Sequence, residues 1–257
     1  MVLRPLKRWI RKTATRLACR HLGLYTDPPV AVSELSHPLG LIKRLGLQCH
    51  GLIHVGANSG HEFDSYCRAG LGSVVYIEPI PEVFARLEQR VGKAAGHHAI
   101  RALCTDRDGE EVAFHVASNN GLSSSIFPFG SHADRHPHVT YQATLRLKTT
   151  TLDRIIFETP GLRPDLLDCL VIDVQGAEAK VLAGGMRTLQ LCRFVFVEIS
   201  EGGLYEGDAP YQEIVAMLAR AGFLLKSLDL NRHGWGNAFF VKGGAAHAGA
   251  STPIQPE

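Results

Sequence analysis

Two closely spaced glycines follow a short apolar run in the segment GLIHVGANSGHE, residues 51–62. Gly56 stands where the run stops, and Gly60 is expected to open the helix that follows. Glycine adopts the backbone angles of a tight turn, and its missing side chain lets a ligand approach the backbone closely. The GANSG spacing matches neither the GxGxxG of many dinucleotide sites nor the GxxxxGK(S/T) phosphate loop. The turn therefore predicts a ligand site without deciding which ligand it holds.

An acidic residue, Glu78, ends the next apolar run, VVYIE. In nucleotide-binding βαβ units, an acid about 20 residues beyond the glycine turn holds the ribose hydroxyls. The turn and Glu78 together predict an adenosine-type ligand, and they fit NAD and S-adenosylmethionine equally well. The plain alternative is an ordinary βα turn followed by a solvated glutamate. His54, on the run before the turn, is placed either to contact the polar end of the ligand or to be a hydrogen-bonded core histidine.

The segments that carry these residues alternate between strand and helix. Buried strands are expected at 52–55, 74–77, 169–172 and 194–199, and helices at 61–69, 81–91, 177–190 and 210–221. This alternation predicts a doubly wound parallel sheet, in which ligands bind beyond the carboxyl ends of the strands. Two more strand-like runs, 223–230 and 238–241, predict a hairpin at the sheet edge. The stretch 111–150 opens with strand-like EVAFHVA and then breaks the rhythm, which predicts an irregular insertion near the ligand crevice.

Composition is typical of one α/β domain with short additions. The chain has 257 residues, of which 45% are hydrophobic. The formal net charge of +2 gives no global argument for a nucleic-acid partner, and none is predicted. The six cysteines are scattered without a CxxC pair, which favours free thiols in a reducing compartment. No stretch approaches the ~20 apolar residues of a membrane-spanning helix. We expect a cytoplasmic protein.

The two ends of the chain differ from its central part. Residues 1–45 combine the basic amphipathic segment MVLRPLKRWIRKTATRLACR with a connector that contains prolines. A helix of this kind can lie on an anionic membrane surface or dock on the domain, so peripheral membrane contact is one hypothesis. Residues 46–242 are assigned to the main domain, and the small, polar residues 243–257 are assigned to a disordered tail. The oligomeric state is left open.

Three segments together resemble the FkbM-type S-adenosylmethionine-dependent methyltransferases: GLIHVGANSGHE, YIEPIPEVFARLEQ and LLDCLVIDVQGAEAKVLAGG. The third is the most specific, because IDVQGAE is not generic to Rossmann-like folds. TTTLDRII before it and VEISEGGLYEGDAPYQEIVAMLARAGF after it extend the resemblance over about residues 51–241. The resemblance implies a Rossmann-like, seven-stranded class I methyltransferase fold of the α/β class. Its sheet would be mostly parallel with an antiparallel edge hairpin.

The resemblance also implies a site for the cofactor S-adenosylmethionine. The family pattern carries an aspartate where this chain has His54, so the contact that this aspartate makes with the cofactor's amino group does not carry over to this chain. Family members are typically O-methyltransferases for hydroxyls of sugars, glycolipids or polyketides. The implied cofactor residues are Gly56, Ala57, Asn58 and Gly60 around the methionine part, Glu78 on the ribose, Pro79 beside the adenine, and Cys104 and Thr105 nearest to it.

Methyl transfer to an alcohol requires a positioned acceptor oxygen and a group that takes its proton. Asp173, the aspartate of IDV, is expected to end its strand and is the first choice for this base or for orienting the acceptor, and it is also counted with the cofactor residues. Glu198 is the second choice. Glu178 is assigned to substrate binding, although the helix dipole alone explains an acid in a first helical turn. Gln175 is expected to hydrogen-bond the acceptor.

Other polar residues are assigned to the acceptor because of their place in loops. In the insertion, Asn120, Ser123 and Ser124 have short side chains that suit sugar hydroxyls, although a solvated loop has the same composition. Tyr205 and His233 follow later strands and are expected to line the acceptor pocket. Clustered acids, or the histidines of SHADRHPH, can hold a metal ion in principle. Nothing in their spacing sets a ligand number, so no metal site is predicted.

Several functions compete on this evidence. The leading hypothesis is a methyltransferase for a hydroxyl of a sugar, glycan or glycolipid, and a secondary-metabolite hydroxyl is the nearest variant. An NAD-linked oxidoreductase would share the glycine turn and Glu78, but it gives no reason for IDVQGAE. A non-catalytic module that keeps the fold is a further class, motivated by the histidine at position 54. The near-neutral charge disfavours methylation of nucleic acid.

Overall fold

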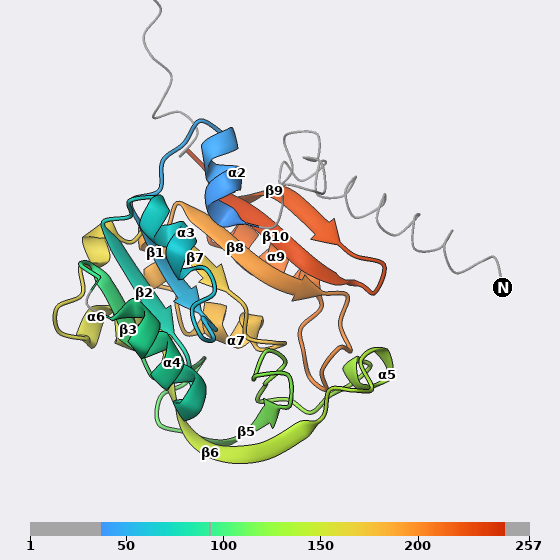
Figure 1. Cartoon of the computed structure of the whole chain (residues 1–257). Helices are drawn as coiled ribbons and strands as arrows, with labels where there is room; N and C mark the ends of the chain where they lie inside the picture. Colours follow the sequence, from blue (N-terminus) through green and yellow to red (C-terminus); the bar gives the residue numbers. More distant parts are fainter. Residues whose placement is uncertain (1–36, 93, 245–257) are drawn as a thin grey trace, which may run out of the picture.

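A seven-stranded sheet forms the centre of the protein (Figure 1). The computed structural model describes residues 37–92 and 94–244. The strand order is β3-β2-β1-β7-β8-β10-β9, and neighbouring strands run parallel except that β10 is antiparallel to both β8 and β9. The predicted Rossmann-like sheet with an antiparallel edge hairpin is confirmed. The strands are β1 (Gly51–Val55), β2 (Ser73–Ile77), β3 (His97–Ile100), β7 (Cys169–Ile172), β8 (Phe194–Ser200), β9 (Phe223–Leu230) and β10 (Trp235–Lys242).

The central strands form where continuous apolar runs can be buried on both faces of a sheet. Every residue of β1, β2 and β7 is buried. The predicted runs match β1, β2, β7 and β8 to within one residue at each end, and β9 matches its predicted run. The last strand begins at Trp235, earlier than predicted, because the backbone of Trp235 pairs with that of Ser200. β3 was not predicted, since its four residues are all partly exposed.

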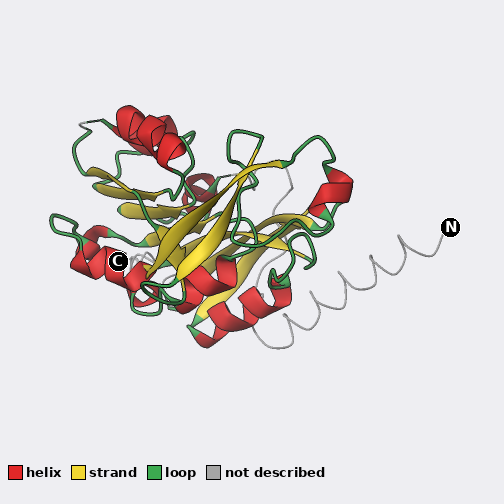
Figure 2. Ribbon diagram, turned by 90° about the horizontal axis from the view of Figure 1, so that it is seen from below, coloured by secondary structure: helices red, strands yellow, loops and turns green. Residues whose placement is uncertain are grey.

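Helices lie on both sides of the sheet (Figure 2). Successive side chains of a strand point to opposite faces, so Leu52 packs with one set of helices and Ile53 with the other. One face is covered by α2 (Pro38–Arg44), α3 (Phe63–Arg68) and α4 (Pro81–Val91). The other face is covered by α6 (Leu152–Glu158), α7 (Glu178–Ala183), α8 (Thr188–Leu191) and α9 (Tyr211–Arg220), and a short 3-10 turn, η2 (Pro164–Leu166), precedes β7.

Two of the predicted helices have different ends in the structure. The segment 177–190 is not one helix, because α7 ends at Ala183 and α8 begins at Thr188. Gly184 follows α7, and a Cβ there would lie 2.1 Å from the carbonyl oxygen of Thr105, so close packing on the neighbouring strand requires a glycine. Gly60 does not open a helix. It lies in a turn with φ of +75°, and α3 starts at Phe63.

The insertion is more regular than its sequence indicated. The predicted strand EVAFHVA is β5 (Glu111–Ala117), and it pairs antiparallel with a long strand that was not predicted, β6 (Tyr141–Thr151). With β4 (Leu103–Thr105) these strands form a second sheet in the order β4-β6-β5, and the one-turn helix α5 (His132–Arg135) lies between β5 and β6. In Figure 1 this small sheet occupies the bottom of the molecule. Phe114 and Val116 form a separate small core with Ile80 of the main domain.

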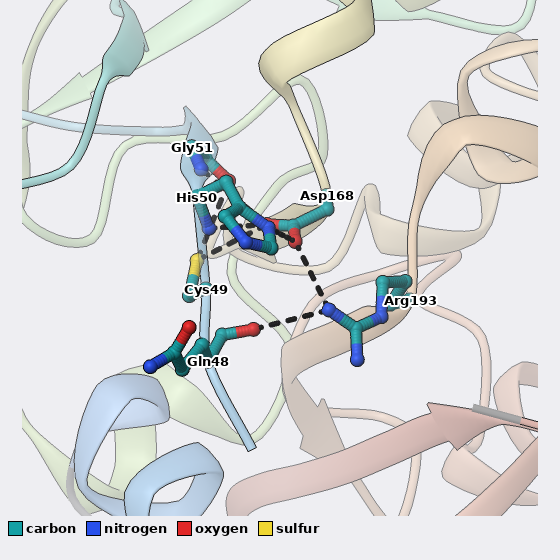
Figure 3. A network of polar contacts seen from close by, with 6 residues as sticks. All are labelled: Gln48, Cys49, His50, Gly51, Asp168 and Arg193. Carbon is teal, nitrogen blue, oxygen red and sulfur yellow. Dashed lines mark hydrogen bonds and ion pairs between the residues drawn. The ribbon is translucent and has the colours of Figure 1, made fainter. Parts of the chain in front are cut away.

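A polar network ties β1, β7 and β8 together at their amino ends (Figure 3). The Asp168 carboxylate accepts hydrogen bonds from the backbone N–H of His50, at 3.0 Å, and from the Cys49 thiol, at 3.3 Å. The His50 ring lies 2.8 Å from the same carboxylate, and Arg193 lies 3.6 Å from it. Since ligands bind at the opposite, carboxyl ends of parallel strands, we assign this network to stability rather than to function.

The ends of the chain are described only in part. The predicted basic helix and the predicted tail fall mostly on residues 1–36 and 245–257, which lie outside the described residues. Of the predicted connector, α2 is described, and its Leu41 and Ile42 are buried in the same cluster as Leu52. The domain boundaries stay predictions. Within residues 37–92 and 94–244, no helix has the length and apolar character that crossing a membrane requires.

Candidate active site

A cleft of about 780 Å³ lies at the carboxyl ends of β1, β2 and β7. From β1 the strand order continues to β2 and β3 on one side, and it continues to β7 and β8 on the other. The point between β1 and β7 is a switch point, which is the usual ligand site of doubly wound sheets. The predicted cofactor residues that line the cleft are His54, Gly56, Ala57, Asn58, Glu78, Pro79, Cys104 and Asp173.

Two residues predicted for the cofactor do not line the cleft. Gly60 faces α4, where a Cβ would lie 2.9 Å from Leu87, and its carbonyl oxygen accepts a hydrogen bond from Arg90. Thr105 is buried, and its hydroxyl donates to the carbonyl oxygen of Arg107 at 3.0 Å. Gly60 therefore lets the turn pack on α4, and Thr105 stabilises the turn after β4.

Gly56 has the positive φ that was predicted for a tight turn, and it also packs closely against the end of β7. Its φ is +85°, and a Cβ there would lie 1.8 Å from the carbonyl oxygen of Asp173. The backbone N–H groups of Gly56 and Ala57 both donate to the carbonyl oxygen of Ile77. Gly56 thus packs against the residue after β7 as well as lining the cleft, and this packing brings Asp173 next to the glycine turn.

Glu78 is a buried acid whose carboxyl group is held at the cleft by two backbone donors. Its side chain accepts hydrogen bonds from the N–H groups of Asn58, at 3.0 Å, and Ile80, at 2.8 Å. Burial raises the pKa of Glu78 to about 7, against the lowering effect of these two hydrogen bonds. A carboxylate desolvated in this way gains from further donors, and the hydroxyls of a ribose would supply them.

His54 combines the two alternatives that its sequence position left open. It lines the cleft, and its Nδ1 lies 3.2 Å from the hydroxyl of the fully buried Tyr66. Burial lowers the pKa of His54, so the ring is neutral near pH 7, and Glu62 at 4.0 Å only partly opposes this effect. Because Nδ1 is engaged with Tyr66, Nε2 is the ring nitrogen that a ligand can use.

Asp173 and Glu198 both accept a hydrogen bond from the side-chain amide of Gln175. The distances from Nε2 are 2.6 Å to Oδ1 of Asp173 and 2.5 Å to Oε2 of Glu198. Asp173 is exposed to the cleft, whereas burial, followed by the charges of Asp173 and Glu178, raises the pKa of Glu198 well above its usual range. Both N–H donors of the Gln175 side chain are in use within the protein, and its hydrogen bond to an acceptor stays a prediction.

A smaller hollow of about 230 Å³ is lined by Glu178, Glu198, Tyr205 and Trp235. Tyr205 connects it to the cleft, because its hydroxyl donates to Oε1 of Gln175 at 2.7 Å. Glu178 accepts hydrogen bonds from the N–H groups of Val174 and Gly176, and burial raises its pKa to about 7. Through these two hydrogen bonds, Glu178 holds the loop that carries Asp173 and Gln175.

The other predicted acceptor residues have mainly internal partners. Ser124 lines the cleft, but its hydroxyl accepts from the N–H of Ala117 at 2.9 Å. Ser123 bonds to Asn119 and to the ring of the buried His132. The exposed Asn120 accepts a hydrogen bond on its carbonyl oxygen from Asn58, which ties the insertion to the glycine turn. In the described part of the chain, no cluster of His, Cys, Asp or Glu side chains is placed to hold a metal ion.

His233 is not brought to the site. It is exposed in the β9–β10 turn beside Arg232, and it lines neither the cleft nor the smaller hollow. The residues that sequence reasoning missed are the apolar side chains on the insertion side of the cleft. These side chains are Leu103, Phe114, Leu122 and Ile126. The period-two alternation of EVAFHVA could have indicated that Phe114 faces inward, but no local pattern indicates the other three.

The strand order and the site at the switch point define a Rossmann-like class I methyltransferase fold. Residues 54–225 match the family model described as the methyltransferase FkbM domain. The chain therefore belongs to the FkbM methyltransferase family, as the sequence resemblance predicted. It is an S-adenosylmethionine-dependent methyltransferase.

One relative and several solved structures are similar to this chain. The 2-O-methyltransferase NoeI of Sinorhizobium fredii (strain NBRC 101917 / NGR234) is 29% identical over 174 residues, which are 65% of this chain and 70% of the relative. Aeropyrum pernix fibrillarin with bound S-adenosyl-L-methionine has a TM-score of 0.39 and 14% identity, over 76% of this chain and 67% of its own. A TehB-like methyltransferase from Corynebacterium glutamicum has a TM-score of 0.41 and 10% identity, over 92% and 95% of the two chains. These TM-scores are low, so the fold assignment rests on the strand order.

Proposed function

We propose that this protein transfers the methyl group of S-adenosylmethionine to a hydroxyl of a sugar, glycan or glycolipid. The observation that carries the proposal is the exposed Asp173 carboxylate, which lies in the cleft beside the glycine turn. The similarity to the 2-O-methyltransferase NoeI supports a hydroxyl acceptor. A secondary-metabolite hydroxyl is the alternative acceptor within the same reaction class.

The residues around the cleft fit the parts of the cofactor. Glu78 would hold the ribose hydroxyls, and Leu103, Phe114 and Ile126 would enclose the adenine with apolar surface. The turn from Gly56 to Asn58 and the Nε2 of His54 would contact the methionine part. When bound, the cofactor supplies a methyl group on a sulfonium that is already activated for displacement, so the protein's main task is to position the acceptor oxygen.

Asp173 is the proposed base that takes the acceptor's proton. Its neighbours Glu78, Glu178 and Glu198 all have raised pKa values because of burial, and the negative charge of Asp173 adds to the effect in each case. These three acids therefore tend to keep a proton near neutral pH, which favours Asp173 as the proton acceptor at the cleft. A positioned base of this kind contributes about 10²–10⁴-fold to the rate.

The acceptor is proposed to bind on the side of the smaller hollow. Trp235 and Tyr205 line it together with the two acids Glu178 and Glu198, and Gln175 joins it to the cleft. An aromatic face beside carboxylates suits a sugar, because the ring's C–H groups can pack on the tryptophan while its hydroxyls donate to the acids. A flat aromatic metabolite could also stack there, which keeps the alternative acceptor open.

Membrane contact and location are separate proposals. The basic segment in residues 1–36 favours an acceptor on a lipid, since such segments associate with anionic surfaces. We expect a cytoplasmic protein that is in contact with the membrane surface. Co-sedimentation with vesicles of phosphatidylglycerol and phosphatidylcholine tests the contact. The full chain is compared with a variant in which the segment's lysines and arginines are replaced by serine. Equal binding of both forms would rule out this segment.

Two measurements test the proposed function in order. The first is the thermal unfolding midpoint with S-adenosylhomocysteine or NAD, because a ligand at ~100 times its dissociation constant stabilises the fold by about 2.7 kcal/mol. We expect a shift with S-adenosylhomocysteine and none with NAD. The second is transfer of labelled methyl to a panel of methyl glycosides and to a panel of polyphenols. Methylation of polyphenols alone would replace the sugar proposal with the secondary-metabolite alternative.

A further inference from the structure

Four parts of the fold converge on Gln175. Its Nε2 donates to Asp173, in its own loop, and to Glu198 on β8. Its Oε1 accepts from the hydroxyl of Tyr205, in the loop after β8, and its backbone carbonyl accepts from the hydroxyl of Ser125 in the insertion at 2.7 Å. Its φ of +56° lies in the left-handed region, which residues other than glycine rarely adopt. The surroundings therefore hold both the backbone and the side chain of Gln175 in one arrangement.

The Tyr205 hydroxyl helps to hold the Gln175 amide in one direction. The NH₂ group faces Asp173 and Glu198, and Oε1 accepts from the Tyr205 hydroxyl at 2.7 Å, closer than the carbonyl oxygen of Ser123 at 3.4 Å. Tyr205 is 1% exposed, and its ring packs against Phe129 and His132. Burial raises its pKa above the usual range, so the hydroxyl keeps its proton and remains a donor. The ring is fixed by packing and cannot follow a rotating amide.

The amide in turn fixes the carboxylate of Asp173. Asp173 is exposed to the cleft, and a solvated carboxylate rotates freely unless a partner holds it. The hydrogen bond from Nε2 to Oδ1, at 2.6 Å, limits this rotation. One contact thus sets the direction of the proposed base.

We propose that Tyr205 is a positioning residue for the methyl transfer and acts on Asp173 only through the amide of Gln175. The proposal rests on Asp173 as the base of the proposed function. It assigns Tyr205 to orienting the catalytic machinery, in place of the acceptor contact that its sequence position predicted. Because the effect passes through one amide, the two residues must behave as a single unit when they are mutated.

A double-mutant cycle tests this unit. The variants are Tyr205→Phe, Gln175→Asn and the two combined, with Tyr211→Phe as the matched control for loss of a buried phenol hydroxyl on α9. Asparagine tolerates positive φ, but its side chain is too short to span both acids. The substrates are S-adenosylmethionine and the methyl glycoside that the wild type methylates fastest. We expect Tyr205→Phe to lower kcat roughly tenfold to a hundredfold. KM for the cofactor and the unfolding midpoint should stay near those of the Tyr211→Phe control.

The combined variant decides between the two roles of Tyr205. We expect it to be no slower than Gln175→Asn alone, because the shorter asparagine side chain no longer links the tyrosine to Asp173. If Tyr205→Phe slows Gln175→Asn as much as it slows the wild type, Tyr205 contacts the acceptor directly and the proposal is wrong. A Tyr205→Phe variant with wild-type kcat would also overturn it.

A second readout does not depend on turnover. Carboxyl-¹³C NMR titration of Glu198 in the protein without substrates should show that Tyr205→Phe moves its titration to higher pH, since the Gln175 hydrogen bond that lowers the pKa of Glu198 is no longer held in place. An unchanged titration would contradict the positioning role. If no glycoside is methylated at all, the proposed function fails, but the NMR titration still tests the link between Tyr205 and Glu198.

Discussion

The carboxyl group of Glu78 accepts a hydrogen bond from the backbone N–H of Asn58, with 3.0 Å between the nitrogen and Oε2. This contact joins the end of β2 to the glycine turn after β1, and Ile80 donates to the other oxygen at 2.8 Å. The acid is 4% exposed, and burial raises its pKa to about 7. Glu78 is therefore partly protonated at neutral pH in the absence of ligand, although it faces the cleft where a ribose is proposed to bind.

Cofactor affinity is expected to rise with pH as Glu78 ionises. The hydroxyls of a ribose would donate to the carboxylate and lower its pKa in the complex, so binding releases a proton below the free-protein pKa of about 7. The dissociation constant of S-adenosylhomocysteine should fall about tenfold for each unit of pH between about 5.5 and 7, and then level off. Isothermal titration calorimetry measures this dependence.

The Glu78→Gln variant is the control for the source of the pH dependence. Its amide oxygen can accept from only one of the two backbone donors, and it cannot ionise. We expect weaker binding of S-adenosylhomocysteine at about pH 8, and a dissociation constant that no longer changes between about pH 5.5 and 7. A wild-type affinity that is constant over this range would show that Glu78 does not change its charge on binding.

The parts of the fold that the sequence predicts well are those with a strong local signal. β1, β2 and β7 are continuous apolar runs, and α4 begins with a proline, so each is evident from a few neighbouring residues. β6 was missed because its residues are mostly exposed or half-buried, and no apolar face stands out in YQATLRLKTTT. The predicted helix 177–190 ends early, at Ala183, and the next residue, Gly184, packs closely against the backbone of Thr105, which lies far away in the sequence.

The candidate site shows the same division between local and distant information. Glu78 was found because its spacing from the glycine turn is a property of the βαβ unit. The role of Gln175 could not be found, since its partners Glu198 and Tyr205 come from other elements and only the folded sheet brings them together. Thr105 was assigned together with Cys104 from the family resemblance, but of the two only Cys104 lines the cleft, and the Thr105 hydroxyl instead donates to the carbonyl oxygen of Arg107.

Replacing Asp173 by asparagine should slow methyl transfer while leaving the site assembled. The asparagine oxygen can still accept from Nε2 of Gln175, so the geometry is kept, but the group can no longer take a proton. We expect kcat to fall by about 10²–10⁴-fold. The dissociation constant of S-adenosylhomocysteine should change only severalfold. Labelled-methyl transfer and calorimetry provide the two values, and a variant with wild-type kcat would move the base to another group, with Glu198 the next candidate.

Gly56→Ala should be strongly destabilising. The added Cβ would lie 1.8 Å from the carbonyl oxygen of Asp173, so the end of β1 or the end of β7 must move. We expect a loss of about 3 kcal/mol or more in the free energy of unfolding, measured by urea denaturation. Gly161→Ala is the matched control, because Gly161 has the same φ of +85° with open space around it, and it should lose only about 1 kcal/mol. Equal losses would mean that the backbone angle, and not the contact with Asp173, requires glycine at position 56.

Asp168→Ala should destabilise the fold without weakening cofactor binding. The carboxylate lies between the amino ends of β1 and β7, where it accepts hydrogen bonds from the N–H of His50 and the thiol of Cys49. The ring of His50 also contacts it, and Arg193 approaches it from the start of β8 (Figure 3). Removing the carboxylate leaves partly buried donors without an acceptor, so we expect the free energy of unfolding, measured by urea denaturation, to fall by about 2–4 kcal/mol.

The dissociation constant of S-adenosylhomocysteine should be unchanged in Asp168→Ala, because the cleft lies at the opposite ends of these strands. Asp165→Ala serves as the control, since Asp165 is exposed and its side chain pairs with Arg163 on the surface. It should leave the denaturation midpoint close to that of the wild type. If Asp168→Ala instead weakened cofactor binding while the midpoint stayed constant, the network at the amino ends would be coupled to the site, and its assignment to stability alone would be wrong.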